Sequence, residues 1–422
     1  MAKTSVTRTY RARVRNHSQV RDDLDSLGFA ASKLWNVARW TVGRVWDACG
    51  QIPSAFDLQK YLKSHERYAD LHSQSSQRVL AELAEAFTAW YGHRGNGNQN
   101  ANPPGYRKHN DEHPRSTVTF KQAGFKHDAA NQRIRLSKGS NLKDGWGDFI
   151  LCEYDVIGPR GTTVENIQQV RAVYEHGVWR LHIVCKVPVE VAEAPGDRTA
   201  SVDLGICNVA AISFGDGSLL YPGGTLKEDE YYFAKQRAKC DDSFSREARR
   251  LDRKRTDRRT HFFHTLSKEI VEQCAERGVG TVFVGDLGGI RDGDDGPKNW
   301  GRHGNLDLHG WAFDRFTTML TYKAEIRGIA VETVSERDTS KTCSVCGTKA
   351  DSQRVERGLY VCEECGTVAN ADTNGAENIR QQSTSESSHE DRSTGWLAQP
   401  AVRLFDKTRG GFLPPEQATR EP

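Results

Sequence analysis

The stretch that decides the fold is Thr199-Ala-Ser-Val-Asp203-Leu-Gly-Ile206, which has the pattern of an apolar strand with one aspartate at its centre. Two more strand patterns follow at residues 208–214 and 218–221. The remaining elements alternate, with a helical region at 228–277, a strand at 280–287, a helix at 311–326 and a strand at 329–334. This βββ-α-β-α-β order predicts an α/β layer architecture with a partly parallel sheet.

The sequence before this stretch has a different pattern. Residues 4–14 alternate as a strand, residues 18–91 carry helical apolar stripes, and further strand patterns continue to residue 187. Residues 189–198 (VEVAEAPGDR) have the composition of a linker. We therefore expect an α+β region first, a domain boundary at this linker, and the α/β region after it.

Length and composition narrow the class of protein. A chain of 422 residues is long enough for about two or three domains. It has no apolar run of about 18 residues and no apolar segment behind its basic N-terminus, so we expect neither a membrane-spanning helix nor a secretory signal. The expected location is cytoplasmic. The formal net charge of +3, from 59 basic and 56 acidic residues, does not by itself indicate nucleic-acid binding.

Four of the ten cysteines have a metal-binding spacing. Cys343-Ser-Val-Cys346 and Cys362-Glu-Glu-Cys365 form the pattern C-x2-C-x15-C-x2-C. Two thiolates separated by two residues can reach one ion from a tight turn, and two such turns complete a tetrahedral sulfur site that suits Zn²⁺. Four protein ligands leave no open position, so we expect structural zinc. Two disulfides are the alternative, which the absence of a secretory signal disfavours.

Two aspartates, Asp203 and Asp372, are candidate metal ligands because of their positions in the sequence. Asp203 lies within an apolar strand, where an unpaired carboxylate is costly to bury. Asp372 opens a predicted helix behind the second cysteine pair. Ordinary structural roles, a salt bridge for Asp203 and a helix cap for Asp372, are the alternatives. If the fold brings such carboxylates together, they can hold Mg²⁺, and a two-metal site acts on phosphodiesters.

Taken together and in this order, these motifs resemble the TnpB (OrfB) proteins that bacterial and archaeal insertion sequences encode, which are relatives of type V CRISPR effectors. The resemblance rests on Ser201-Val-Asp203-Leu-Gly205, on Asp338-Thr-Ser-Lys-Thr-Cys343-Ser-Val-Cys346-Gly347, on the second cysteine pair, and on Asp372-x-Asn374-x-Ala376-x-x-Asn378-Ile379. It implies a multidomain fold, in which a β-barrel wedge domain with an inserted helical recognition domain precedes an RNase H-like (RuvC) α/β domain interrupted by a zinc finger.

The resemblance also implies where the domains lie. Their expected bounds are 1–17 and 116–195 for the wedge domain, 18–115 for the recognition domain, 196–339 and 369–380 for the nuclease domain, and 340–368 for the zinc finger. Residues 381–422 contain Ser/Thr/Glu-rich and Gly/Pro-rich pieces, and this composition predicts a mostly disordered tail.

The function that the resemblance implies is RNA-guided DNA cleavage. Members of the family bind a guide RNA from the transposon end and cleave matching DNA beside a short adjacent motif, using a Mg²⁺-dependent RuvC site. Asp203 and Asp372 correspond to the first and the last carboxylate of that site, and both are expected magnesium ligands. A separate tyrosine transposase of the same element performs strand transfer, so the word transposase would describe the element rather than the chemistry of this chain.

One position departs from the family pattern. Gly285 stands where the family has the middle glutamate of the RuvC site. Asp286 is one residue away, but a shift of one residue turns a strand side chain to the other face unless a bulge intervenes. Glu336 follows the strand at 329–334, which we expect to lie parallel to the strand that contains Gly285. We favour Glu336 as the replacement and keep Asp286 as the second candidate.

Two other functions remain open. If neither residue replaces the glutamate, the protein would bind guide and target without cutting, as a programmable DNA-binding or repressor protein. It could also be a guide-independent DNA-binding accessory protein of a transposon, although the two aspartates in carboxylate motifs argue against that.

Clusters of basic residues predict contacts with nucleic acid. A guide–target heteroduplex is held by its backbone, which requires positive surfaces. The candidates are Arg11, Arg13, Arg15, Arg107 and Lys108, together with Arg246, Arg249, Arg250 and Arg253 on one face of a predicted helix. A solvated helix face is the alternative explanation for the second group.

Overall fold

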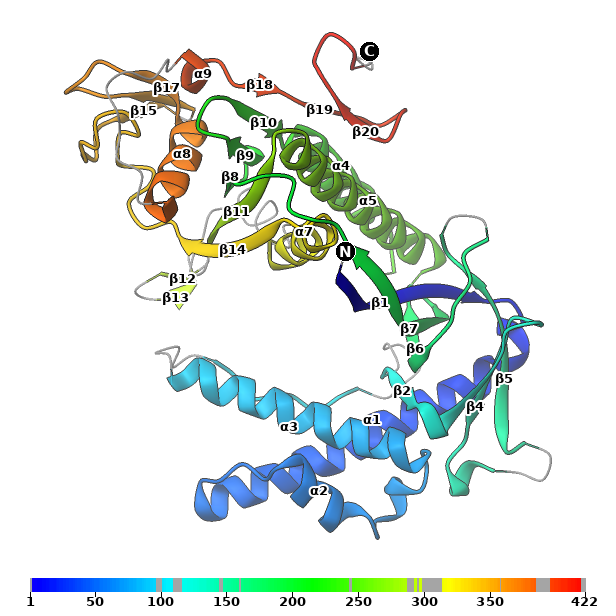
Figure 1. Ribbon diagram of the computed structural model, residues 1–422. Helices are drawn as coiled ribbons and strands as arrows, with labels where there is room; N and C mark the ends of the chain where they lie inside the picture. The colour runs from blue at the N-terminus through cyan, green and yellow to red at the C-terminus, as the bar shows by residue number, and fades with distance from the viewer. Residues whose placement is uncertain are drawn as a thin grey trace. The chain divides into compact units, whose positions relative to one another are not determined.

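The computed structural model describes residues 2–95, 101–108, 116–143, 147–158, 161–242, 245–286, 292–293, 296–297, 313–356, 358–384 and 395–418. The chain divides into two compact units, one of residues 5–188 and the other of residues 189–422 with the first four residues (Figure 1). The division falls where the linker composition begins, although the last strand of the first unit continues through Val191.

The first unit is built on a seven-stranded sheet with the strand order β2-β6-β7-β1-β5-β4-β3. Its strands are β1 (Ala2–Val14), β2 (Val118–Lys121), β3 (Phe125–Asp128), β4 (Arg133–Ser137), β5 (Phe149–Val156), β6 (Ile167–Glu175) and β7 (Val178–Val191). The two edge strands, β2 and β3, are joined directly by the short helix η2 (Gln122–Gly124). The sheet therefore curls until its edges approach, and it forms a nearly closed barrel.

Strands β6 and β7 form a hairpin, and its turn has a simple cause. His176 and Gly177 both have positive φ angles, 49° and 85°. Two consecutive residues of this kind form the turn whose twist matches that of antiparallel strands.

Among the residues described between β1 and β2 there are three α-helices and one short 3₁₀ helix (Glu66–Tyr68). The α-helices are α1 (His17–Cys49), α2 (Ala55–Leu62) and α3 (Ser73–Gly95). Buried apolar residues at helical spacing, such as Leu24, Leu27 and Leu34, connect α1 to the core of the sheet. This layout agrees with an inserted helical region, and the bounds expected for the wedge and recognition domains stay a prediction.

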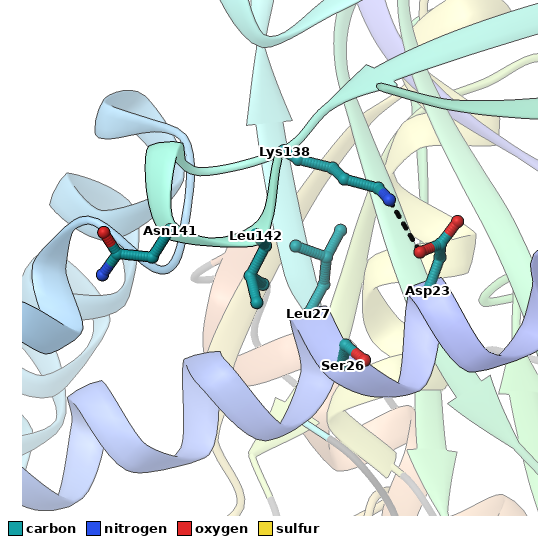
Figure 2. Close-up of a pocket in the computed structure, with 6 residues that line it drawn as sticks. All are labelled: Asp23, Ser26, Leu27, Lys138, Asn141 and Leu142. Atoms are coloured by element: carbon teal, nitrogen blue, oxygen red, sulfur yellow. Dashed lines mark hydrogen bonds and ion pairs between the residues drawn. The ribbon is translucent and has the colours of Figure 1, made fainter. Parts of the chain in front are cut away.

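A small pocket lies where α1 meets the turn after β4 (Figure 2). Lys138 is only 7% exposed, and its Nζ lies 2.7 Å from Oδ1 of Asp23. A buried ammonium needs such a partner, because an unpaired charge is costly to bury. The pair therefore connects the barrel to α1.

The second unit contains a six-stranded sheet with the order β14-β11-β8-β9-β10-β18. Its strands are β8 (Arg198–Leu204), β9 (Asn208–Ser213), β10 (Ser218–Pro222), β11 (Val279–Asp286), β14 (Ala330–Ser335) and β18 (Ala401–Val402). Strands β8, β11 and β14 are parallel, and β9 is antiparallel to β8 and β10. The order of elements along the chain is the predicted one, although the helical region is two helices, α4 (Gly224–Arg237) and α5 (Arg246–Glu276).

Helices cover both faces of this sheet. Val202, Leu204 and Val284 share an apolar core with side chains of α5 and of α7 (Phe313–Ile326). On the other face, Ala211 and Leu220 pack with Ala376 of α8 (Ala371–Thr384). Because side chains alternate along a strand, the residues between the core positions of β8 point toward α8. Asp203 is one of these residues, so the face under α8 carries the acidic chemistry.

The expectation of a mostly disordered tail is wrong for most of the segment from residue 381 onward. Helix α8 continues to Thr384, and residues 395–418 form α9 (Gly395–Ala398), β18, β19 (Leu404–Asp406) and β20 (Gly411–Leu413). A few apolar residues outweigh the polar composition: Leu397 enters the core around the cysteines, and Phe412 packs on Tyr221 with ring centroids 5.2 Å apart. β18 also pairs with β10 at the edge of the sheet.

No helix among the described residues is long and apolar enough to cross a membrane.

Candidate metal centres

The four cysteines lie on two turns that have the same geometry. The N–H of Gly347 donates to the carbonyl of Cys343 at 2.9 Å, and the N–H of Gly366 donates to that of Cys362 at 3.0 Å. Both glycines have positive φ angles, 76° and 70°, which other residues adopt at a cost. Each turn therefore presents two sulfurs toward the same point. The second turn joins β16 (Leu359–Val361) to β17 (Val368–Asn370), beside β15 (Arg354–Glu356).

The sulfur positions fit a zinc ion. All four Sγ atoms lie within 4.8 Å of one another. The cross pairs Cys343–Cys365 and Cys346–Cys362 are 3.7 Å and 3.5 Å apart. Tetrahedral zinc with bonds of about 2.3 Å separates its sulfurs by about 3.8 Å, whereas a disulfide would bring them to about 2 Å. The cluster thus fits a structural zinc site and excludes the disulfide alternative.

Asp203 lies on β8 directly under α8. Val202 pairs with Val284 of the parallel strand β11, so Asp203 lies beside Gly285 on the same face of the sheet. A Cβ on Gly375 of α8 would lie 2.7 Å from Oδ2 of Asp203, so this glycine lets the helix approach the carboxylate. Burial raises the pKa of Asp203 well above its ordinary value, and the carboxylates of Glu336 and Asp372 raise it further.

Glu336 occupies the space that a side chain at position 285 would need. A Cβ built on Gly285 would overlap the carboxylate of Glu336. Oε1 of Glu336 is buried and has no hydrogen-bond partner among the described residues. Burial raises the pKa of Glu336 to about 7, with a further contribution from Asp286. An unpartnered carboxylate oxygen beside Asp203 is a suitable ligand for a hard divalent cation.

Asp286 has a different orientation. It is the last residue of β11, and it pairs in register with Ser335 of β14. Adjacent residues of a strand point to opposite faces, so Asp286 does not share the face of Asp203 and Gly285, and it is exposed. The register between β11 and β14 has no irregularity at Gly285 that would act as the rescuing bulge.

Asp372 reaches the same region from the first turn of α8. Asn370 caps this helix, because its Oδ1 accepts from the N–H groups of Asp372 at 3.1 Å and Thr373 at 3.2 Å. The carboxylate of Asp372 accepts from Nδ2 of Asn208 at 2.7 Å and lies 3.1 Å from the guanidinium of Arg354. The asparagine at position 370 is therefore a structural cap, and Asp372 is held by two partners.

The structure brings the carboxylates of Glu336 and Asp372 close enough to Asp203 to raise the pKa of its buried carboxyl group. Among the described residues, only the cysteines form a group of three or more acidic, histidine or cysteine ligands within 4.8 Å, so the three carboxylates are spaced more widely than the sulfurs. Their oxygen chemistry and the unpartnered Oε1 of Glu336 fit Mg²⁺.

Two partners of Asp372 were missed by the sequence analysis. Arg354 lies on a short exposed strand of the cysteine region, and Asn208 begins β9. Neither stands in a recognisable motif, and only the folded arrangement shows that they contact Asp372. Asn374 and Asn378 belong to the motif that begins at Asp372, but the sequence does not indicate which groups they contact.

The basic residues of β1 have mixed surroundings. Arg11 is paired with Glu175, with Nη2 2.8 Å from Oε2. Arg15 lies 3.8 Å from the carboxylate of Asp155, and Arg13 is exposed. Exposed or loosely paired cations are available to phosphates, and the nucleic-acid contacts of these three residues stay a prediction.

Arg107 has a packing role. Its guanidinium carbon lies 3.6 Å from the ring centroid of Trp35, and Nη2 lies 3.7 Å from Oε2 of Glu82. Burial lowers its pKa. Arg107 therefore holds its loop against the helices, whereas Lys108 is exposed. For both residues a contact with nucleic acid stays a prediction.

The basic face of α5 is largely exposed. Arg246 and Arg253 are exposed, and Arg249 is half-buried. Arg250 is paired with Glu247, with Nη2 2.6 Å from Oε1. This surface stays a predicted contact for a nucleic-acid backbone.

Comparisons with known proteins find two family models and several relatives. The model OrfB_IS605, described as a probable transposase, matches residues 182–291, and the TNB domain of Cas12f1-like proteins matches residues 313–379. The TnpB-like protein ORF457 of Acidianus two-tailed virus is 27% identical over 360 residues, which is 76% of this chain and 75% of that protein. The putative RNA-guided DNA endonuclease InsQ of Escherichia coli K12 is 24% identical over 74% of each chain.

Matches to type V effectors are shorter or less similar. The CRISPR-associated endodeoxyribonuclease Cas12f1 of Sulfoacidibacillus thermotolerans is 34% identical over 116 residues, which is 28% of this chain and 25% of that protein. The structure of a Cas12f1-sgRNA-target DNA complex superimposes with a TM-score of 0.38 at 15% identity, covering 90% of this chain and 100% of that one.

The fold and the two centres define a mixed α/β protein with a barrel-like sheet and a four-cysteine cluster. The chain is similar to the TnpB/OrfB proteins over about three quarters of its length, and to Cas12f1 proteins over shorter segments. The resemblance predicted from the motifs is thus confirmed.

Proposed function

We propose that this protein is an RNA-guided DNA endonuclease of the TnpB kind, which cleaves DNA beside a short adjacent motif at a Mg²⁺-dependent RuvC site. Two relatives that align with about three quarters of the chain are named as a TnpB-like protein and as a putative RNA-guided DNA endonuclease. Guide RNA from the transposon end and target DNA are the proposed partners, and a separate tyrosine transposase serves the same element. The proposed location is cytoplasmic.

The observation that carries this proposal is the position of Glu336. This chain has Gly285 where the family pattern has its middle glutamate. The carboxylate of Glu336 fills the space that a side chain at position 285 would need. A third carboxylate is therefore available beside Asp203 and on the same face of the sheet. This supports Glu336 rather than Asp286 as the replacement ligand.

The roles of the residues follow from their chemistry. Asp203, Glu336 and Asp372 would hold the magnesium ions, which stabilise the attacking and leaving oxygens of a phosphodiester when they are bound. Asn208 and Arg354 orient the carboxylate of Asp372. Arg354 also adds a positive charge beside the acidic groups, and guanidinium groups are well suited to phosphate oxygens. The zinc cluster has a structural role.

Binding of nucleic acid is assigned to the exposed basic surfaces. Arg13 on β1 and Arg246 and Arg253 on α5 are exposed. Such residues bind a backbone without regard to its sequence, which suits a heteroduplex whose sequence is read by base pairing. The wedge, recognition, nuclease and zinc-finger bounds given above remain part of the proposal.

A guided binder that does not cut is the second candidate, because Gly285 removes the family's own glutamate. The experiment that separates the two candidates uses the complex with its copurified RNA. That RNA is sequenced, and a plasmid with the matching target and a library of flanking motifs is incubated with the complex and Mg²⁺. Cutting that is lost in Asp203→Ala supports the nuclease. Target binding without cutting in the parent supports the binder, and absence of RNA contradicts both.

A further inference from the structure

One stripe of α8 faces the segment that leads from β14 into the cysteine region. Asn374, Asn378 and Gln381 lie four and three residues apart, so they share one side of the helix. Nδ2 of Asn378 donates to the carbonyls of Thr339 at 2.8 Å and Thr342 at 2.7 Å. All of the polar contacts of this amide nitrogen therefore go to the connecting segment.

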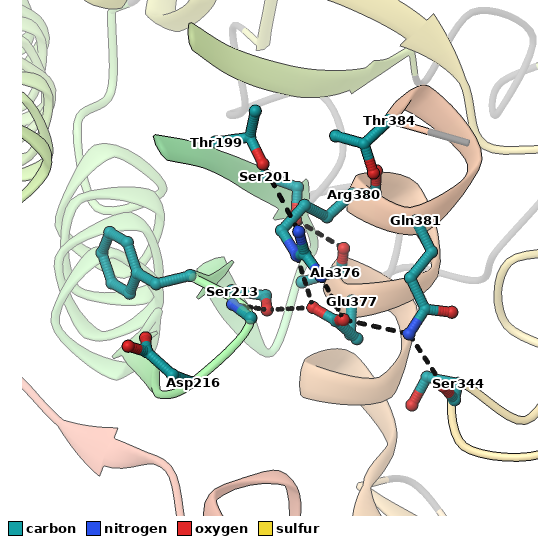
Figure 3. A network of polar contacts seen from close by, with 12 residues as sticks. Thr199, Ser201, Ser213, Asp216, Ser344, Ala376, Glu377, Arg380, Gln381 and Thr384 are labelled. Carbon is teal, nitrogen blue, oxygen red and sulfur yellow. Dashed lines mark hydrogen bonds and ion pairs between the residues drawn. The ribbon is translucent and has the colours of Figure 1, made fainter. Parts of the chain in front are cut away.

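The other members of the stripe contact the same segment. Nδ2 of Asn374 donates to the carbonyl of Thr342 at 2.8 Å, and its Oδ1 accepts from the N–H of Ser344 at 3.0 Å. Gln381 donates to the carbonyl of Ser344 at 2.8 Å (Figure 3). Because Asn374 and Asn378 are almost completely buried, water does not replace these bonds easily.

The segment begins at Glu336. Thr339 is bonded to the carbonyl of Glu336 through its hydroxyl at 2.9 Å and its N–H at 3.2 Å. Asp338 between them has a φ of 66°, a left-handed conformation that aspartate tolerates better than most residues. A turn with this conformation persists when surrounding bonds determine it, and Asn378 supplies such a bond at Thr339.

The side of α8 next to this stripe is fixed to the sheet, and Gln381 also donates to Oε1 of Glu377 there at 3.0 Å (Figure 3). Glu377 and Arg380 form a buried ion pair at 2.8 Å, and the hydroxyl of Ser213 donates to Glu377 at 2.5 Å. The hydroxyl of Ser201, two residues before Asp203, donates to the carbonyl of Ala376 at 2.5 Å. The helix is thus a rigid base against which the connecting segment is positioned.

From these contacts we infer that Asn378 is a positioning residue, which holds the turn after β14 so that the carboxylate of Glu336 stays beside Asp203. Asn374 supports the same segment at Thr342 and Ser344. The inference rests on the proposed function, because it assigns Glu336 to the divalent-cation site. It makes α8 the element that couples the zinc region to the carboxylates, since the residue that follows Thr342 in the chain is the first zinc ligand, Cys343.

The test measures binding of Mn²⁺, a spectroscopic substitute for Mg²⁺, by electron paramagnetic resonance on the full chain with its zinc. Asn378→Leu preserves the size of the side chain and removes both donated bonds. Partners that orient metal ligands are typically worth 10–100-fold in affinity, so we expect Mn²⁺ to bind about tenfold more weakly at unchanged zinc content. Asn378→Gln keeps the donors and should bind more tightly than Asn378→Leu.

Ser267→Ala is the matched control. Ser267 is buried on α5, on the other side of the sheet, and its hydroxyl donates to the carbonyl of Phe263 at 2.7 Å. This variant loses that bond and the one that Ser267 accepts from Nζ of Lys323 at 2.6 Å, both in the same unit, without touching the carboxylates. We expect a lower melting temperature and an unchanged affinity for Mn²⁺.

A second variant decides the matter if Asn378→Leu does not fold. Thr339→Val keeps the shape of Thr339 and removes only the hydroxyl bond to Glu336, so we expect a smaller loss of Mn²⁺ affinity, about threefold. If Asn378→Leu folds and binds Mn²⁺ with the parental affinity, the inference is overturned. If Asn378→Leu does not fold, parental Mn²⁺ affinity in Thr339→Val overturns it. If the parent binds no Mn²⁺, or if Asp203→Ala binds Mn²⁺ as tightly as the parent, the proposed metal site itself is wrong. That result is distinct from failure of the inference about Asn378.

Discussion

The cysteine cluster and the carboxylate centre are both candidate metal sites, but they are built differently. The cysteine ligands come from two turns of one short segment, between Cys343 and Cys365, and each turn is closed by its own backbone hydrogen bond. The carboxylates come from β8, from the residue after β14 and from α8. One site is determined by local turns, and the other depends on the register of a sheet and the docking of a helix.

This difference has an energetic consequence. The four thiolates share one closed site, in which a bound zinc ion contributes directly to folding. Burial raises the pKa values of Asp203 and Glu336, and nearby carboxylates raise them further. The cysteine cluster therefore serves stability, whereas the carboxylate centre stores unfavourable charge that a cation relieves. Four predictions test this contrast.

The largest effect is expected from removing a zinc ligand. Cys362 is buried in the core of the cysteine region, next to Tyr360. Cys362→Ser should abolish zinc binding and cutting together, because structural zinc contributes about 10 kcal/mol or more to the folding of such modules and this region also carries Arg354. Metal analysis and plasmid cutting check this. Cys49→Ser, at an exposed free cysteine on α1, should change neither. A zinc-free variant that cuts normally would show that the two centres are independent.

The next prediction exchanges the positions of the third carboxylate. Glu336→Ala should lower cutting by about 10²-fold or more, a loss of about 3 kcal/mol at the transition state. Gly285→Glu alone should also impair cutting, because its side chain would overlap Glu336. The double variant Gly285→Glu/Glu336→Ala should recover at least part of the activity, because the space is then free for the family's own glutamate.

Rates of plasmid cutting at saturating Mg²⁺ measure these three variants. Asp286→Ala is the matched control, since its carboxylate is exposed and on the other face. Glu336→Ala with parental activity would contradict the assignment of Glu336, and loss of activity only in Asp286→Ala would transfer it to Asp286.

A smaller effect is expected at Arg354. Its side chain is 43% exposed, so its ion pair with Asp372 is partly screened by solvent. Arg354→Ala should lower the cutting rate by about tenfold while the affinity for target DNA stays the same. Arg354→Lys should fall between the two, because an ammonium keeps the charge without the bidentate geometry. If target affinity falls and the cutting rate of bound DNA does not, Arg354 is a DNA contact instead.

The two centres also differ in what the sequence reveals. The cysteine spacing identifies its site because neighbours along the chain determine the geometry. Asp203 is visible as an acid within an apolar strand. The choice between Glu336 and Asp286 depends on the register between β11 and β14, which the sequence does not specify. Arg354 gives no signal at all, because its contact with Asp372 exists only after the zinc region docks on α8.

The segment from residue 381 onward shows that composition can also predict too little structure. Its average composition is polar, and composition predicts disorder. Three apolar residues, Leu397, Phe405 and Phe412, pack on cores formed by the rest of the unit, and β18 pairs with β10 at the edge of the sheet. Average composition does not contain this information, because docking depends on which residues meet a complementary surface.

The smallest predicted effect concerns stability and pH, and it isolates the unfavourable charge of the carboxylate centre. Glu336 has a folded-state pKa of about 7, above the ordinary value of 4.5 that it takes in the unfolded chain. Between these values the folded state binds more protons than the unfolded state, so stability falls as pH rises through this range. Glu336→Gln carries no such charge. Without added divalent cations, it should therefore gain stability relative to the parent between pH 5 and pH 8, measured as the difference in urea midpoints with zinc retained. Added Mg²⁺ should stabilise the parent more than the variant at pH 8. If the difference in urea midpoints between variant and parent is the same at pH 5 and pH 8, Glu336 is not held in a destabilising environment.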